Sequence, residues 1–77
     1  MSHASVDITR EVCPMTWVRV KLRLETLEPG DTLEVLLKGD EPLRNLPRNA
    51  RDEGHLVRSL DALGDGTARL VIELRRA

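Results

Sequence analysis

The chain has 77 residues, of which 40% are hydrophobic and 32% are charged, and its formal net charge is −1. This length suits one small domain, so we expect residues 1–77 to fold as a single unit. The near-neutral charge and an aromatic content of 1% argue against direct nucleic-acid binding, which relies on basic surfaces and stacking side chains.

The cysteine count and the apolar runs limit the cellular setting. A single cysteine excludes an internal disulfide, the usual support of small secreted domains. No stretch resembles a signal peptide, and no apolar run approaches the roughly 20 residues of a membrane span. We therefore expect a cytoplasmic protein with no membrane contact.

The N-terminal part of the chain predicts a strand followed by a helix. Residues 4–8 alternate apolar and polar side chains, as a short strand does. Pro14 suits the first turn of a helix, and Pro29-Gly30 supplies a stop signal after residues 14–27. Residues 18–25 also alternate, which taken alone indicates a strand. The length of the run and its Arg, Lys, Leu and Glu residues favour the helix.

This predicted helix carries two apolar stripes, and only one of them can face a sheet. The first stripe has helical spacing and consists of Trp17, Val20, Leu24 and Leu27. The second consists of Met15, Val18 and Leu22. The second stripe is either covered by another element or exposed for a partner, and the pattern is compatible with both.

The middle of the chain predicts a strand and a second helix. Residues 32–38 place apolar side chains on one face, and Gly39 ends the strand. Asp40 is expected to cap the following helix, which Gly54 ends. Pro47 lies inside this helix and is expected to bend or shorten it.

The C-terminal part predicts a β-hairpin. Residues 55–63 and 67–74 read as strands, joined by the turn residues Gly64-Asp65-Gly66. The resulting order is βαβαββ. Two helices and one sheet pack most economically as a two-layer α/β (α+β) sandwich.

Cys13 is the strongest candidate for chemistry. It directly precedes Pro14 and would lie at the start of the first helix, where unpaired N–H groups and the helix dipole favour the thiolate. The thiolate is the nucleophilic form of cysteine. The alternative is a small buried residue at a loop–helix junction. His3 and His55 are too isolated to complete a metal site with one cysteine, so we predict no metal or cofactor.

Basic residues near this helix have two interpretations. Arg10, Arg19, Lys21 and Arg23 are either a solvated charged face or an electrostatic docking surface for an acidic partner. On the second interpretation, the residues predicted to contact a partner are Met15, Val18, Arg19, Leu22 and Arg23.

Several short motifs occur in an order that resembles the TusA/SirA-like proteins. They are Cys13-Pro14, Leu-Glu-Pro-Gly-Asp at 27–31, Gly-Asp-Glu-Pro at 39–42, Asn-Leu-Pro at 45–47 and the terminal hairpin. The resemblance extends from about Val6 to Arg75 and implies a mixed four-stranded sheet carrying two helices on one face. Thr16 stands where this family commonly has a second proline, and its hydroxyl can hold the first turn by bonding to nearby backbone.

The resemblance also implies a function. Better-known members are sulfur carriers whose cysteine, here Cys13, accepts sulfane sulfur as a persulfide. It implies a sulfur-donor protein, either a cysteine desulfurase or a rhodanese, and a sulfur-acceptor protein. The lack of a second cysteine agrees with a carrier, since a resolving thiol must come from another protein. The alternative is a non-catalytic binding or regulatory module on the same fold.

Overall fold

A computed structural model describes residues 3–10 and 15–75, with Met15 described by its backbone alone. The elements are β1 (His3–Asp7), α1 (Met15–Leu24), β2 (Thr32–Lys38), α2 (Asp40–Asp52), β3 (Leu56–Gly64) and β4 (Thr67–Glu73). The predicted βαβαββ order is therefore confirmed. No helix in these residues is long and apolar enough to cross a membrane.

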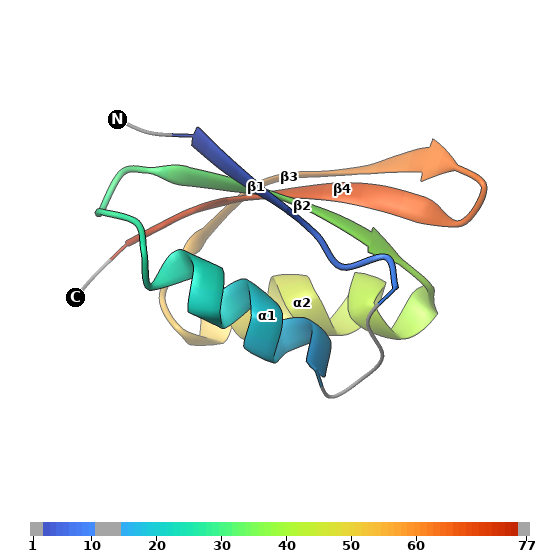
Figure 1. Ribbon diagram of the computed structural model, residues 1–77, viewed down its shortest axis with the longest axis horizontal. Coiled ribbons are helices and arrows are strands. Elements are labelled where there is room, and N and C mark those ends of the chain that lie inside the picture. The colour runs from blue at the N-terminus through green and yellow to red at the C-terminus, as the bar shows by residue number, and fades with distance from the viewer. Residues whose placement is uncertain (1–2, 11–14, 76–77) are drawn as a thin grey trace.

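The four strands form one mixed sheet, and both helices cover the same face of it (Figure 1). The strand order is β1-β2-β4-β3, so β1 and β3 are the two edges. β1 runs parallel to β2, whereas β2 pairs with β4, and β4 with β3, in antiparallel fashion. This arrangement confirms the two-layer α+β fold that the sequence predicts.

The hydrophobic core lies between the sheet and the helices. Because side chains alternate along a strand, every second residue of the two central strands faces the helices. The buried residues of these strands are Leu33, Val35 and Leu37 on β2 and Ala68, Leu70 and Ile72 on β4. The helices contribute Val20 and Leu24 from α1 and Leu46 and Ala50 from α2.

The helical interpretation of residues 14–27 is correct, although α1 is shorter than predicted. It ends at Leu24, and Leu27 reaches the core from the turn that follows. Within the first apolar stripe, Val20 is 0% exposed, Leu24 is 2% exposed, and Trp17 packs partly buried against the core. Residues 18–25 do not form a strand despite their alternation. A helix places Trp17, Val20 and Leu24 on the face toward the core, whereas a strand would turn Trp17 to the opposite face.

One prediction about α2 is wrong. Gly39, not Asp40, is the residue that precedes the first turn, and no side chain caps the helix there. Gly39 adopts φ 101°, a conformation that favours glycine, which explains the residue type. Pro47 was expected to bend or shorten α2, and the helix continues past it to Asp52, so it is not shortened there. Pro47 is buried beside Leu46, and this burial offsets part of the roughly 3 kcal/mol that an interior proline costs.

The predicted hairpin between β3 and β4 is confirmed. Asp65 and Gly66 form its turn, with φ values of 48° and 83°. Positive φ at both central residues suits the right-handed twist of the flanking strands, and Asp-Gly tolerates this conformation well. The hairpin turn extends past the start of α2 in Figure 1.

Candidate functional site

The candidate site is the start of α1. The helix begins at Met15, two positions after the only cysteine along the chain. Cys13 and Pro14 themselves lie outside the described residues, so the placement of the thiol remains a prediction. The helix that it was predicted to precede is confirmed.

The charges on α1 are compatible with an anion at its N-terminus. The first turn contains no acidic residue, and the last turn contains the basic residues Lys21 and Arg23. The N-terminal end of a helix carries partial positive charge, and a carboxylate there would compete with any other anion. Nothing in the first turn of α1 therefore opposes the thiolate form of a nearby cysteine.

Thr16 lies in the first turn and is only 5% exposed. It stands at the position predicted to support the start of the helix. A hydroxyl at this depth would be costly without a hydrogen-bond partner, and no described side chain is buried with an unsatisfied polar atom. Thr16 is therefore accommodated as part of the packed first turn, and its supporting role stays a prediction.

A shallow hollow of about 390 Å³ lies between the first turns of α1 and the adjacent face of α2. We call it the α1–α2 hollow. Its α1 side is made by Thr16, Trp17 and Val18, and its α2 side includes Asn45 and Arg48. The Arg48 guanidinium donates a hydrogen bond of 3.2 Å to Asn45 Oδ1.

The residues on the α2 side of this hollow were not predicted from the sequence as site residues. Their signal was available, because residues 45, 48 and 49 are spaced i, i+3 and i+4 and so share one helix face. What the sequence did not reveal is that this polar face of α2 lies beside the start of α1.

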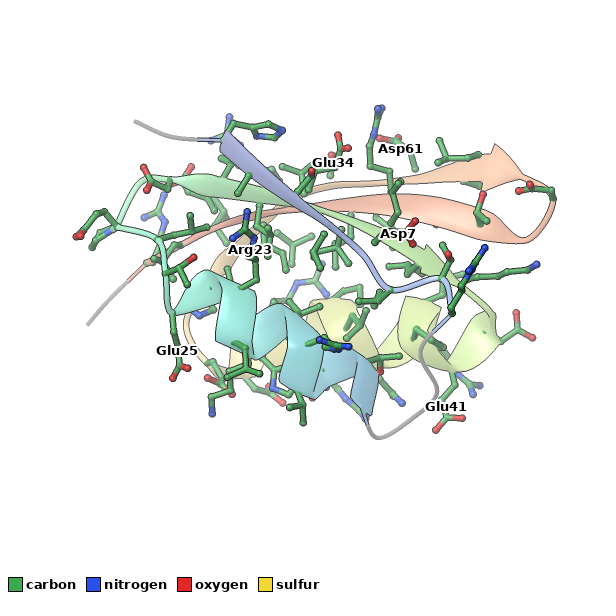
Figure 2. All side chains as sticks on the ribbon, viewed as in Figure 1. Asp7, Arg23, Glu25, Glu34, Glu41 and Asp61 are labelled. Carbon is green, nitrogen blue, oxygen red and sulfur yellow. The ribbon has the colours of Figure 1, made fainter. Side chains whose placement is uncertain are left out.

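The second apolar stripe of α1 is exposed rather than covered by a described element. Val18 is 42% exposed and Leu22 is 57% exposed. Arg19 and Arg23 are also exposed, so four of the five residues predicted to contact a partner share an exposed face. The fifth, Met15, has no described side chain. Figure 2 shows Arg23 on the side of α1 toward β1 and Glu25 pointing away from the sheet.

Lys21 lies on the flank of α1 that faces α2. Its Nζ is 3.4 Å from Glu53 Oε2, and the Trp17 indole N–H donates a 3.3 Å hydrogen bond to the same carboxylate oxygen. Glu53 thus links α1 to the C-terminal end of α2. Lys21 belongs to this link, whereas Arg19 and Arg23 lie on the exposed face.

The segment that leads from β1 toward the cysteine begins with a tight polar turn. The backbone N–H and the hydroxyl of Thr9 both donate to Asp7 Oδ1, at 2.9 and 2.7 Å. These two hydrogen bonds, the backbone one first, hold the pKa of Asp7 below its usual value. Ile8 follows β1 and is buried, which anchors the same segment to the core.

Asp7→Asn is expected to make the protein less sensitive to acid. A carboxyl with a lowered folded pKa stabilises the fold above its unfolded pKa of about 3.9. That contribution is lost as the pH falls through the folded pKa, whereas asparagine does not titrate. Thermal unfolding measured between about pH 5 and about pH 2 should therefore show a smaller decrease in Tm for the variant.

A second aspartate provides an internal comparison for this prediction. The pKa of Asp65 is lowered by the same kind of hydrogen bonds, from the hydroxyl and the backbone N–H of Thr67. Asp65→Asn should therefore reduce the acid response in the same direction. If Tm fell equally with pH in the parent and in both variants, these two carboxyls would not contribute to acid sensitivity through lowered pKa values.

The two histidines hold structural positions. His3 Nδ1 lies 2.7 Å from Thr32 Oγ1 across the β1–β2 pair, so His3 is part of the sheet, with its side chain exposed. The Arg75 backbone N–H donates to His55 Nδ1 at 3.1 Å, which connects the start of β3 to the end of β4. Among residues 3–10 and 15–75, no three His, Asp or Glu side chains gather as metal ligands would.

Comparison with known proteins places most of the chain in one group. Residues 4–74 match the family model described as Sulfurtransferase TusA. A candidate sulfur carrier protein of Archaeoglobus fulgidus is 35% identical over 68 residues, which cover 88% of this chain and 77% of the relative. Another, from Thermotoga maritima, is 27% identical over 71 residues, which cover 92% of this chain and 90% of the relative.

A solved structure agrees with the same grouping. The crystal structure of a SirA-like protein from Desulfitobacterium hafniense superposes with a TM-score of 0.82 at 26% identity. The superposition covers 95% of this chain and 99% of the other. The resemblance in sequence motifs is therefore matched in the arrangement of strands and helices.

Proposed function

Because this chain belongs to the TusA family of sulfurtransferases, we propose that it is a sulfur carrier in which Cys13 accepts sulfane sulfur and relays it to a partner protein. One observation carries the proposal. The only cysteine of the chain lies two positions before a helix with no acidic residue in its first turn. This is the local setting that favours a reactive thiolate.

The transfer needs only sulfur–sulfur exchange. The Cys13 thiolate attacks the outer sulfur of a donor persulfide, so a new S–S bond forms and the donor S–S bond breaks. The donor leaves as a thiolate, and Cys13 becomes a persulfide. A thiolate of the acceptor then attacks the outer sulfur of Cys13 and releases the Cys13 thiolate. No electron acceptor is required, because each bond formed replaces one broken.

The partners follow from this exchange. The donor is a protein that generates a persulfide, a cysteine desulfurase or a rhodanese, and the acceptor provides its own thiol. A cytoplasmic location is part of the proposal, since a reducing compartment keeps a lone thiol available. The exposed face of α1 (Val18, Arg19, Leu22 and Arg23) is the proposed docking surface.

The test is the intact mass of the protein after exposure to a sulfur donor. The purified chain is incubated with a cysteine desulfurase and cysteine, or with a rhodanese and thiosulfate. A carrier gains the mass of one sulfur atom, and a reductant removes it. A protein that gains no sulfur from either donor would be a binding or regulatory module instead.

Reversing two charges on the docking surface should slow sulfur loading. With Arg19→Glu and Arg23→Glu together, an acidic partner meets repulsion, so the loading rate should fall several-fold and the loss should shrink at high salt. The rate is followed by intact mass over time. Lys38→Glu with Arg69→Glu changes the net charge equally on the sheet face opposite the helices and should have little effect. Equal rates in both double variants would contradict docking through α1.

A further inference from the structure

The two edges of the sheet differ in length and polarity. β1 has five residues, and those on its outer face are the polar His3, Ser5 and Asp7. β3 has nine residues and, in the described structure, pairs only with β4. An edge strand presents a row of unpaired N–H and C=O groups, and short or polar edges are the usual protection against association. β1 has this protection along its whole length, whereas β3 is longer and is protected only by two charged residues and two irregularities in its register.

Apolar side chains concentrate at the β3 edge. Of the six large hydrophobic residues that are exposed among the described ones, three lie on β3: Leu56 at 39%, Leu60 at 41% and Leu63 at 49%. Leu43 of α2, 37% exposed, and Ala62 of β3 line an adjoining hollow of about 220 Å³. Leu60 and Ala62 lie opposite the buried Leu70 and Ala68 and so share the helix-facing side of β3, whereas Leu56 lies opposite Glu73 on the other side. The hairpin turn that follows Leu63 extends past the start of α2 (Figure 1).

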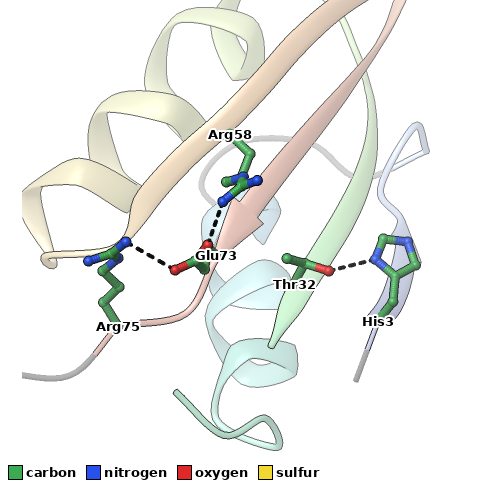
Figure 3. Close-up of polar contacts among 5 residues, drawn as sticks. All are labelled: His3, Thr32, Arg58, Glu73 and Arg75. Atoms are coloured by element: carbon green, nitrogen blue, oxygen red, sulfur yellow. Dashed lines mark hydrogen bonds and ion pairs between the residues drawn. The ribbon is translucent and has the colours of Figure 1, made fainter. Parts of the chain in front are cut away.

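The charges on β3 would complement those of a second, antiparallel copy of the strand. The strand contains two charged residues, Arg58 and Asp61, of opposite sign. Arg58 Nη1 lies 2.8 Å from Glu73 Oε1 (Figure 3), and Asp61 lies opposite Arg69 in the sheet register. Figure 2 shows Asp61 on the face away from the helices. An antiparallel copy of the same strand would therefore meet positive with negative charge.

We propose that two copies of this chain associate through antiparallel pairing of their β3 edges, with Leu60 at the two-fold axis. The pairing joins the two four-stranded sheets into one and places Leu60 against the partner's Leu60. Arg58 then lies within one residue position of the partner's Asp61, and the reverse contact follows by symmetry. Such an interface uses the same patch on both copies, as two-fold dimers do.

The interface is small, so the association is weak and reversible. The β3–β4 register is irregular between Val57 and Ser59 and again between Ala62 and Gly64, which leaves residues 59–62 as the regular segment. Irregularities of this kind bend a strand and limit edge pairing. Stable interfaces bury about 1,200–2,000 Å² in total, more than four regular residues per copy supply. We therefore expect a dimer at high micromolar concentrations and monomers at low ones.

The first test is sedimentation velocity over low micromolar to millimolar concentrations. The parent chain should shift from monomer to dimer, whereas Leu60→Lys should stay monomeric because it places a charge on the two-fold axis. Leu22→Lys is the control, since Leu22 is a leucine that is more exposed than Leu60, at 57% against 41%, but lies on α1. Circular dichroism verifies that each variant is folded, and Leu60→Thr, which keeps a strand-forming residue, replaces any variant that is not. A parent that is monomeric throughout, or a loss of association in Leu22→Lys, would overturn the proposal.

The second test uses charge reversal and distinguishes this pairing from other modes of self-association. Arg58→Asp alone places like charges near each other across the axis, and so does Asp61→Arg alone, so each variant should dimerise about tenfold more weakly. Mixing the two variants restores both opposite-charge contacts, and the mixture should form a heterodimer. Contacts within each chain are the same before and after mixing. A mixture that associates no better than its components refutes antiparallel β3 pairing.

Discussion

Cys13→Ser is expected to abolish sulfur loading while leaving the fold unchanged. Serine keeps the size of the side chain but provides no thiolate, so no persulfide can form and the intact mass should stay constant with every donor. The core residues that hold α1 to the sheet, Val20 and Leu24, are untouched. The Tm of the variant should therefore match that of the parent. Sulfur gained by the Ser variant would place the chemistry elsewhere.

The pH dependence of alkylation gives a second readout of the same thiol. A cysteine activated by a helix N-terminus should react with iodoacetamide with a midpoint below the free-thiol value of about 8.5. A midpoint at or above that value would remove the proposed activation, even if sulfur loading were observed. Sulfur loading therefore tests whether Cys13 carries sulfur, and the pH dependence of alkylation tests whether the helix N-terminus activates its thiol.

Replacing Val18 and Leu22 together by Gln is expected to impair sulfur loading severely without unfolding the protein. Both side chains are exposed, at 42% and 57%, so their loss removes little core packing. If they contact the donor, loading at limiting concentration should fall by about tenfold or more, which corresponds to 1.4 kcal/mol of binding free energy. The loading rate is measured by intact mass, and stability by thermal unfolding.

Leu24→Ala provides the contrasting core variant on the same helix. Leu24 is 2% exposed, and truncating a buried leucine to alanine costs about 2–5 kcal/mol of unfolding free energy. This variant should lose Tm strongly, and its folded fraction should load sulfur normally. If the Val18 and Leu22 variant instead lost stability to a similar extent, these residues would be packing residues and not a docking surface.

Much of the fold could be predicted because local patterns agree with the tertiary structure. The alternation in residues 32–38 predicts β2 with correct bounds, and Asp65-Gly66 predicts the hairpin through its need for positive φ. The helical stripe of Val20 and Leu24 outweighed the alternation that suggested a strand for the same residues. In each case the residues that form the element also determine which side is buried.

The sequence was least informative where distant residues decide the outcome. Asp40 is a good capping residue, but Gly39 precedes the helix in a conformation that its position between β2 and α2 requires. Pro47 breaks most helices, yet here it lies in a full-length helix whose buried side packs on the core with Leu46 and Ala50. Local propensity describes a residue in isolation, and at Pro47 burial of this side of the helix outweighed it.

The sequence by itself determined the candidate nucleophile and the element order. The only cysteine, followed by a proline, can be identified without knowing which residues pack around it. The spacing of apolar residues that distinguishes strands from helices is likewise a local property of the sequence. Only the tertiary structure decided that the second stripe of α1 is exposed and that polar residues of α2 lie beside the start of α1. It also decided that β3, which carries three exposed leucines, lies at an edge of the sheet and not at its centre. Exposure depends on which elements pack together, and that is a property of the whole chain.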